Sequence, residues 1–193
     1  WIDQTVEPDL IPFPALIQAM KESLPKGIYI HPYLNARIWG YPEDSRYFFE
    51  RKTDPKPQQG GVLQENGQIY TEKYGRHYPI MCSKSPIWHE RLEKNAAFLR
   101  SLGAPGVYWD QLPCSTPKLC FNADHGHLLN DPAAWANGYR EFLTAFRKKY
   151  PDVRVRIAVD AERKLTPYFM AGSMLYPMAF IYDTDGKILW NGE

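Results

Sequence analysis

Apolar residues recur along this chain at helical spacing and in short runs, and the two patterns alternate. Three segments place apolar residues three or four positions apart, which is the spacing of one helix face: 14–24, 86–102 and 132–150. A short run rich in apolar residues follows each of them, with the length of a buried strand, at 27–34, 106–110 and 153–159. Ser85 and Asp131 stand where they can cap the second and third helices, each followed by a proline suited to the first helical turn.

Repeated helix-then-strand units predict an α/β fold with a parallel sheet, because parallel neighbours need a helical crossover. The connections after the strands are long and those before them are short, as in a (β/α) barrel. We therefore expect a TIM-type barrel domain over residues 1–176. We expect it to be partial, because a closed barrel takes about 200–250 residues.

Two regions depart from this alternation. Residues 40–80 are rich in proline and glycine and predict a long loop, with a hairpin around Asn66-Gly67. Residues 177–193 predict a separate C-terminal β-hairpin turning at Asp185-Gly186.

Polar side chains gather where the three predicted strands end. They are Asn35, Arg37 and Trp39 after the first strand, Asp110 and Gln111 at the end of the second, and Asp160 and Glu162 after the third. Because the carboxyl ends of parallel strands meet at one edge of a sheet, two of these carboxylates can flank a single bond. A separation of about 5–5.5 Å is typical of a retaining glycosidase and a wider one of an inverting enzyme, and both remain open here. Asp110 can also be a capping residue of its loop.

The loop after Asp110 contains zinc-type ligands: Cys114, Cys120, His125 and His127. Their spacing, Cys-x5-Cys-x4-His-x-His, matches no common structural zinc pattern, so we expect no metal site. A Cys114–Cys120 disulfide remains open, and Cys82 is expected to be a buried small apolar residue. We expect no cofactor.

Composition narrows the partners only a little. The 193 residues carry 23 basic and 22 acidic side chains, so neither a nucleic acid nor an anionic membrane is expected as the main partner. Aromatic residues reach 15%, a content that suits sugar stacking and ordinary cores alike. The sequence contains no apolar run of about 18 residues, so we expect no transmembrane helix. It begins at Trp1 without a signal-peptide segment, and we expect a piece of a longer protein of unknown localisation and oligomeric state.

Several segments together carry a resemblance to a known family. They are Tyr33-Leu-Asn35-Ala-Arg37-Ile-Trp39, Ile80-Met-Cys82 with Trp88, Val107-Tyr-Trp-Asp110-Gln111, Cys120-Phe-Asn-Ala-Asp-His125-Gly-His127, Trp135 and Gly138-Tyr139. In this order, over residues 25–178, the chain resembles an uncharacterised bacterial group of glycoside-hydrolase-like TIM-barrel proteins. It is more distantly similar to retaining α-glycosidases of the α-galactosidase and endo-α-N-acetylgalactosaminidase kind.

The resemblance implies a carbohydrate substrate, with Asp110 as nucleophile and Glu162, followed by Pro167-Tyr168, as acid/base. Asp160 competes with Glu162 for that role, and Thr166 stands where the family has a second Glu. The remaining candidates for substrate binding are Asn35, Arg37, Trp39, Trp109, Gln111, His125, His127 and Asp160. Trp39 and Trp109 would stack on sugar rings, and Arg37 would be a substrate clamp or a salt-bridge partner. His125 and His127 would order their loop or contact substrate hydroxyls.

The sequence therefore favours a glycosidase acting on an O-glycosidic bond. Two alternatives remain open. The first is a non-catalytic carbohydrate-binding or scaffold fragment of such a barrel. The second is a thioredoxin-like module without the redox dithiol, motivated by the tail alone.

Overall fold

The computed structural model describes residues 14–39, 56–74, 76–112, 115–157, 180–182 and 188–191. In chain order its elements are α1 (Pro14–Ser23), the 3-10 helix η2 (Leu24–Lys26), β1 (Tyr33–Asn35), α3 (Lys56–Gln59), β2 (Thr71–Tyr74), β3 (Arg76–Pro79), α4 (Pro86–Ser101), β4 (Gly106–Asp110), the 3-10 helix η3 (Ala123–His125), α5 (Ala134–Lys149), β5 (Arg154–Ile157), β6 (Phe180–Tyr182) and β7 (Ile188–Asn191).

The three long helices lie where the helical spacing predicts them, with one difference at a boundary. Ser85 is the residue before α4 and Pro86 opens it, as expected, but the Ser85 side chain makes no capping hydrogen bond. The third helix begins at Ala134 rather than at Pro132. The reason is local: Asp131 Oδ1 accepts a hydrogen bond from the Ala133 backbone N–H at 2.8 Å, which stabilises a turn ahead of the helix.

Three strands form one parallel sheet in the order β1-β4-β5, as the helix-then-strand pattern predicts. The register places Leu34 beside Trp109 and Asn35 beside Asp110. Since side chains alternate between the two faces of a strand, one face carries Leu34 and Trp109 and the other carries Asn35 and Asp110. The first strand is shorter than expected. It covers Tyr33–Asn35 alone, and residues 27–32 precede it without strand structure.

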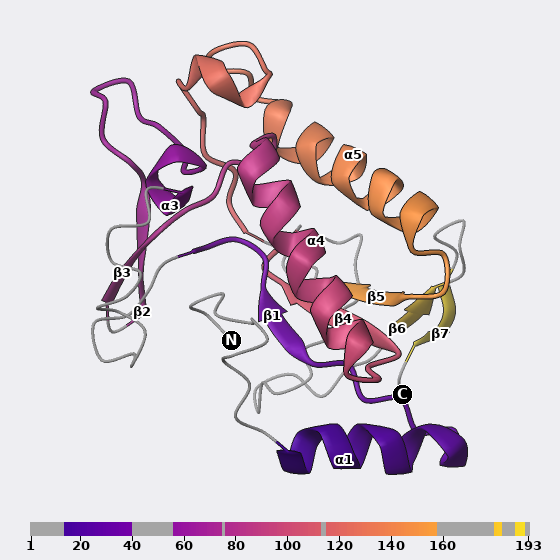
Figure 1. Cartoon of the computed structure of the whole chain (residues 1–193). Helices are drawn as coiled ribbons and strands as arrows, with labels where there is room; N and C mark the ends of the chain where they lie inside the picture. The colour runs from indigo at the N-terminus through magenta and orange to yellow at the C-terminus, as the bar shows by residue number, and fades with distance from the viewer. Residues whose placement is uncertain are drawn as a thin grey trace.

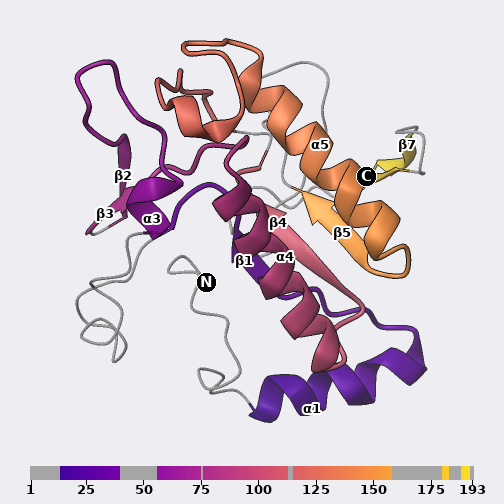
Figure 2. The same ribbon diagram turned by 45° about the horizontal axis from the view of Figure 1, so that its top comes forward.

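Helices α4 and α5 lie on the same side of this sheet (Figures 1 and 2). Trp109 of β4 is fully buried, with its ring 5.1 Å from Phe142 and 5.0 Å from Phe146 of α5, centroid to centroid. The predicted apolar stripe of α4 is buried as well, through Trp88, Leu92, Ala96 and Leu99. Burial of such aromatic and aliphatic side chains is the main source of stability here, at roughly 25 cal/mol per Å² of apolar surface.

The expected long loop at residues 40–80 contains regular structure that the sequence pattern did not indicate. Strands β2 and β3 pair antiparallel, and α3 precedes them. Near Asn66-Gly67 the chain does turn back, with an isolated antiparallel bridge between Leu63 and Ile69. In Figure 1, α3 and the β2–β3 pair lie to the left of α4, away from α1.

Two short strands lie in the C-terminal tail. β6 and β7 pair antiparallel and form a sheet of their own. The segment that joins them, where we expected the Asp185-Gly186 turn, lies outside the described residues. Among the helices that the structure describes, none has the length and apolarity needed to cross a bilayer.

Candidate functional site

Asp110 lies at the carboxyl end of β4, on the sheet face that the helices do not cover. Tyr33 of β1 donates a hydrogen bond to Asp110 Oδ2 at 2.8 Å, and Tyr108 donates a longer one to Oδ1 at 3.4 Å. The two tyrosine rings meet edge to face with centroids 5.5 Å apart. Each carboxylate oxygen therefore has a hydroxyl donor, and the half-buried carboxyl group is fixed in orientation.

Tyr33 is suited to remain the donor in this pair. Burial, and after it the negative charge of Asp110, raise the pKa of Tyr33 far above its usual value. Its hydroxyl therefore keeps its proton at neutral pH, and the hydrogen bond to the carboxylate persists.

Gln111 follows Asp110 in a strained backbone conformation, with φ at 60°. Its side chain lies between two neighbours: Asn35 Nδ2 donates to Gln111 Oε1 at 2.5 Å, and Gln111 Nε2 donates to the Tyr74 hydroxyl at 2.6 Å. A left-handed conformation costs a non-glycine residue roughly 1–2 kcal/mol, and such outliers cluster at functional sites. The Asn35 side chain is buried and its oxygen also accepts from the Arg37 backbone N–H at 2.9 Å, so Asn35 orients Gln111 from within the protein.

Of the two roles left open for Arg37, the structure supports that of a salt-bridge partner. The side chain is 1% exposed, and its Nε lies 2.7 Å from Glu72 Oε1. Its Nη2 donates to the Thr116 carbonyl at 3.1 Å, and its guanidinium carbon lies 5.0 Å from the centroid of the Trp135 ring. A guanidinium held by these three groups braces β2 and the loop after β4 against the core.

The expectation that Trp39 and Trp109 stack on sugars is corrected by their burial. Trp39 is 2% exposed and stacks on Trp88 of α4, with centroids 6.1 Å apart, while Trp109 is 0% exposed beneath α5. Trp109 lies on the helix-covered face of the sheet, one residue out of phase with Asp110. Both rings therefore belong to the core and present no face to a ligand.

The two histidines of the loop do not turn toward Asp110 in any contact that the structure describes. His125 Nδ1 lies 3.4 Å from Cys120 Sγ, and His127 Nε2 lies 3.4 Å from Cys82 Sγ. His125 is 3% exposed, which favours the loop-ordering role over a contact with substrate hydroxyls. Zinc-type ligands thus do come together, but the cysteine that completes the set with Cys120 is Cys82, where the sequence suggested Cys114.

The two thiols in this cluster affect each other. A hydrogen bond between their side chains lowers the pKa of Cys120 and raises that of Cys82, which burial raises further. Burial alone would lower the pKa of His125, but its contacts with Cys120 and with the Gln59 carbonyl raise it. Both thiols are free and buried.

Two residues of the predicted site, Asp160 and Glu162, lie outside the described residues, and so does Cys114. The expected carboxylate pair is therefore described on its Asp110 side only, and the Cys114–Cys120 disulfide remains a prediction.

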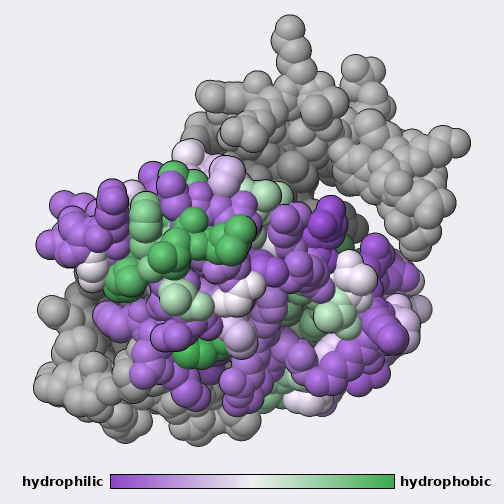
Figure 3. Space-filling view, turned by 90° about the horizontal axis from the view of Figure 1, so that it is seen from above, coloured by the Kyte–Doolittle hydropathy of each residue, from purple (hydrophilic) through white to green (hydrophobic). Residues whose placement is uncertain are grey.

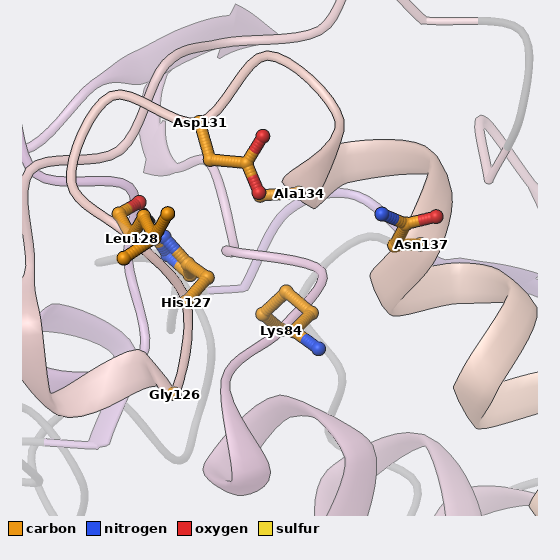
Figure 4. Close-up of a pocket in the computed structure, with 7 residues that line it drawn as sticks. All are labelled: Lys84, Gly126, His127, Leu128, Asp131, Ala134 and Asn137. Carbon is orange, nitrogen blue, oxygen red and sulfur yellow. Dashed lines mark hydrogen bonds between the residues drawn. The ribbon is translucent and has the colours of Figure 1, made fainter.

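Two cavities are formed by described residues near the loop after β4. One, of about 380 Å³, is lined by Lys84, Gly126, His127, Leu128, Asp131, Ala134 and Asn137 (Figure 4). The other, of about 720 Å³, lies between the turn around Asn66 and residues 117–121. Figure 3 shows the end of the molecule toward which this loop lies, a largely hydrophilic surface with an apolar patch. Leu128 and Leu129 of the loop are 79% and 55% exposed.

Comparison with known proteins identifies relatives of this chain. A protein of Bacteroides thetaiotaomicron named "Putative glycoside hydrolase" is 31% identical over 147 residues, which is 74% of this chain and 21% of that protein. The chain spans about a fifth or less of the length of the curated relatives it matches.

Solved structures share the fold. The α-N-acetylgalactosaminidase NagBb of Bifidobacterium bifidum, in complex with GalNAc, matches with a TM-score of 0.54 at 13% identity, over 79% of this chain and 24% of that one. The α-galactosidase TtGalA of Thermus thermophilus, in complex with stachyose, matches with a TM-score of 0.50 at 12% identity, over 75% and 28%. At such identities the likeness concerns the fold alone, and a mixed α/β architecture with a parallel sheet is consistent with part of a barrel. The model of a family described as a domain of unknown function (DUF6259) matches residues 8–184, nearly the whole chain, and the chain belongs to this family.

Proposed function

We propose that this chain supplies the carboxylate-bearing part of a glycoside hydrolase barrel, which acts on an O-glycosidic bond. The observation that carries the proposal is the setting of Asp110: a half-buried carboxylate at a strand end, oriented by the hydroxyls of Tyr33 and Tyr108. Residues 1–176 would form part of the barrel domain, with the tail as a separate hairpin.

In this proposal Asp110 attacks or stabilises the anomeric carbon. Oriented hydroxyl donors favour one carboxylate rotamer, so that an unshared electron pair can face the sugar. Glu162 would protonate the leaving oxygen, with Asp160 as the competing candidate. The substrate is a carbohydrate, because the aligned relative is named a glycoside hydrolase.

Gln111 and Tyr74 would contact sugar hydroxyls next to Asp110. The Tyr74 side chain is exposed, and the Gln111 amide is held toward it by Asn35. Amide and phenol groups can both donate and accept hydrogen bonds, as recognition of sugar hydroxyls requires.

The test uses the full-length protein and a panel of activated aryl α- and β-glycosides. We expect turnover of at least one substrate, and a fall in kcat/KM of about 10³-fold or more in Asp110→Asn and in Glu162→Gln. Asp152→Asn is the matched control, because this exposed carboxylate pairs with Arg100 and is not part of the site. An unchanged rate in Asp110→Asn would refute the assignment.

A mechanism-based 2-deoxy-2-fluoroglycoside then identifies the nucleophile. In a retaining enzyme the sugar should become attached to the peptide that contains Asp110, which mass spectrometry of a digest detects. The anomeric configuration of the first product, followed by NMR, separates retention from inversion. If the wild type binds sugars but turns over none of the panel, the carbohydrate-binding alternative is correct.

A further inference from the structure

Two cysteines and two histidines meet in the interior next to the start of α4. The ligand atoms of Cys82, Cys120, His125 and His127 all lie within 4.8 Å of one another. We propose that these four side chains bind one zinc ion, in a structural site that fastens the loop after β4 to the segment before α4. Nothing in the glycosidase proposal requires this site, so the two stand or fall separately.

The spacing of the four atoms suits tetrahedral coordination. With zinc–sulfur bonds of about 2.3 Å and zinc–nitrogen bonds of about 2.0–2.1 Å, neighbouring sulfur and nitrogen ligands are about 3.5 Å apart. The two sulfur–nitrogen distances that run from Cys82 to His127 and from Cys120 to His125 are both 3.4 Å. Since all four atoms lie within 4.8 Å of one another, no pair exceeds the tetrahedral edge by more than roughly 1.5 Å, which side-chain rotation can close.

The outward nitrogen of each imidazole lies against a backbone carbonyl, and His125 Nε2 is also 3.2 Å from Asn122 Nδ2. His125 Nε2 lies 2.8 Å from the Gln59 carbonyl oxygen, and His127 Nδ1 lies 2.7 Å from the Leu128 carbonyl oxygen. When each outward nitrogen donates to its carbonyl, loss of the proton on the inner nitrogen leaves a neutral ring whose free nitrogen faces the sulfurs, as metal binding requires. This arrangement of a ligand nitrogen inside and a backbone acceptor outside fixes the tautomer and the ring orientation.

The backbone holds the four ligands together from two distant segments. Gly126, between the two histidines, has φ at 69°, a left-handed conformation that turns the chain between them. On the other side, the Cys82 backbone N–H donates to the Gly60 carbonyl at 2.9 Å. The Asn130 N–H donates to the Cys120 carbonyl at 2.9 Å and closes the loop. A bound ion would add a cross-link between segments that these hydrogen bonds already bring together.

The burial of these side chains favours a structural metal site over a catalytic role for the cysteines and histidines. Cys82, Cys120 and His125 are each 2–3% exposed, so a nucleophilic cysteine here would have no access to a substrate. His127 alone reaches the wall of the smaller cavity (Figure 4). Four protein ligands leave no open coordination position, which is the arrangement of structural zinc. Two thiolates and two imidazoles also favour zinc over magnesium or calcium, which prefer oxygen ligands.

The primary test is the metal content of the full-length protein purified from zinc-supplemented medium, measured by mass spectrometry of the elements. We expect about one zinc per chain in the wild type, and a loss of at least about 80% of it in Cys82→Ser and in His127→Gln. Replacement of zinc by Co²⁺ should give the thiolate-to-cobalt charge-transfer band and the strong visible bands of a tetrahedral site. A wild type with less than about 0.2 zinc per chain, and without these bands after cobalt addition, overturns the proposal.

Two variants serve as matched controls. His77→Gln changes an exposed histidine that hydrogen-bonds Thr71, and Cys114→Ser changes the third cysteine of the chain. Both should retain zinc at the wild-type level. Loss of the metal in Cys114→Ser but not in Cys82→Ser would overturn the four-residue set.

A stability measurement covers the case in which a ligand variant fails to fold. Removal of zinc from the wild type with a chelator should lower Tm by roughly 10 °C, and added Zn²⁺ should restore it, because a metal that binds only the folded state stabilises that state. The same treatment should leave the Tm of a folded Cys120→Ser variant unchanged. If the Tm of the wild type changes neither with the chelator nor with added zinc, the proposal of a structural metal is contradicted.

Discussion

Helix α5 lies unusually close to the backbone of Ser83, and this contact sets a large penalty for one added methyl group. A Cβ placed on Gly138 would lie 2.3 Å from the Ser83 carbonyl oxygen and 2.4 Å from its carbonyl carbon. Optimal carbon–carbon contacts are about 3.5–4.0 Å, so Gly138→Ala must move the helix or the Ser83 segment by about 1 Å or more. The Ser83 hydroxyl also donates to the Ala134 carbonyl at 3.1 Å, and the same movement would strain that bond.

Two free-energy contributions of opposite sign determine the stability of Gly138→Ala. Alanine is favoured over glycine inside a helix by about 1 kcal/mol. Overpacking against a backbone that cannot rotate away costs about 3 kcal/mol, the upper part of the usual range. The expected net loss is therefore about 2 kcal/mol of unfolding free energy, or about 4–8 °C in Tm for a chain of this length.

Urea denaturation followed by circular dichroism measures the difference, with zinc held in excess so that the metal content does not vary. Ala145→Gly, on the exposed face of α5, is the control for intrinsic helix preference and should cost about 1 kcal/mol. If Gly138→Ala is as stable as the wild type or more stable, the close approach of α5 to Ser83 is wrong.

Three further changes test other contacts. Trp109→Ala removes a fully buried ring and should cost about 3–5 kcal/mol of unfolding free energy in urea titration, whereas a loss below about 1 kcal/mol would contradict its burial. Tyr33→Phe deletes the donor to Asp110 and should cost about 1 kcal/mol of stability while lowering kcat of any hydrolysis; a kcat equal to that of the wild type would remove the positioning role. Burial lowers the pKa of His89, against the opposing hydrogen bond to the Ser83 carbonyl. The stability that comes from keeping His89 neutral is therefore complete above its unfolded value of 6.5 and is lost as the pH falls below it, so the decline in unfolding free energy between about pH 7.5 and 5.5 should be shallower in His89→Gln.

The local sequence pattern was sufficient to predict the helices and strands that bury one face. The 3.6-residue spacing of apolar positions in α4 and α5, and the short apolar run of β4, predict those elements because burial of a regular face is a local property. The same pattern placed Asp110 at a strand end. Strict alternation along β1 and β4 could also have identified Tyr33 and Tyr108, which lie two residues before Asn35 and Asp110 on the same face.

Only the tertiary structure decided which side chains meet. The pairing of β2 with β3 depends on contacts across the sheet rather than on a periodic sequence, and it brings Glu72 to Arg37 and Tyr74 to Gln111. A tryptophan at a strand end can face a ligand or the core, and the phase of the strand beneath α5 placed Trp109 in the core.

The cysteine and histidine cluster is the clearest case of side chains whose proximity the sequence did not predict. The spacing of Cys120, His125 and His127 resembles no common zinc motif, because the fourth member, Cys82, comes from a segment on the other side of α4 and β4 in the chain. Residue types determine that such a set can hold a metal, whereas chain folding alone determines that its members lie within reach of one ion.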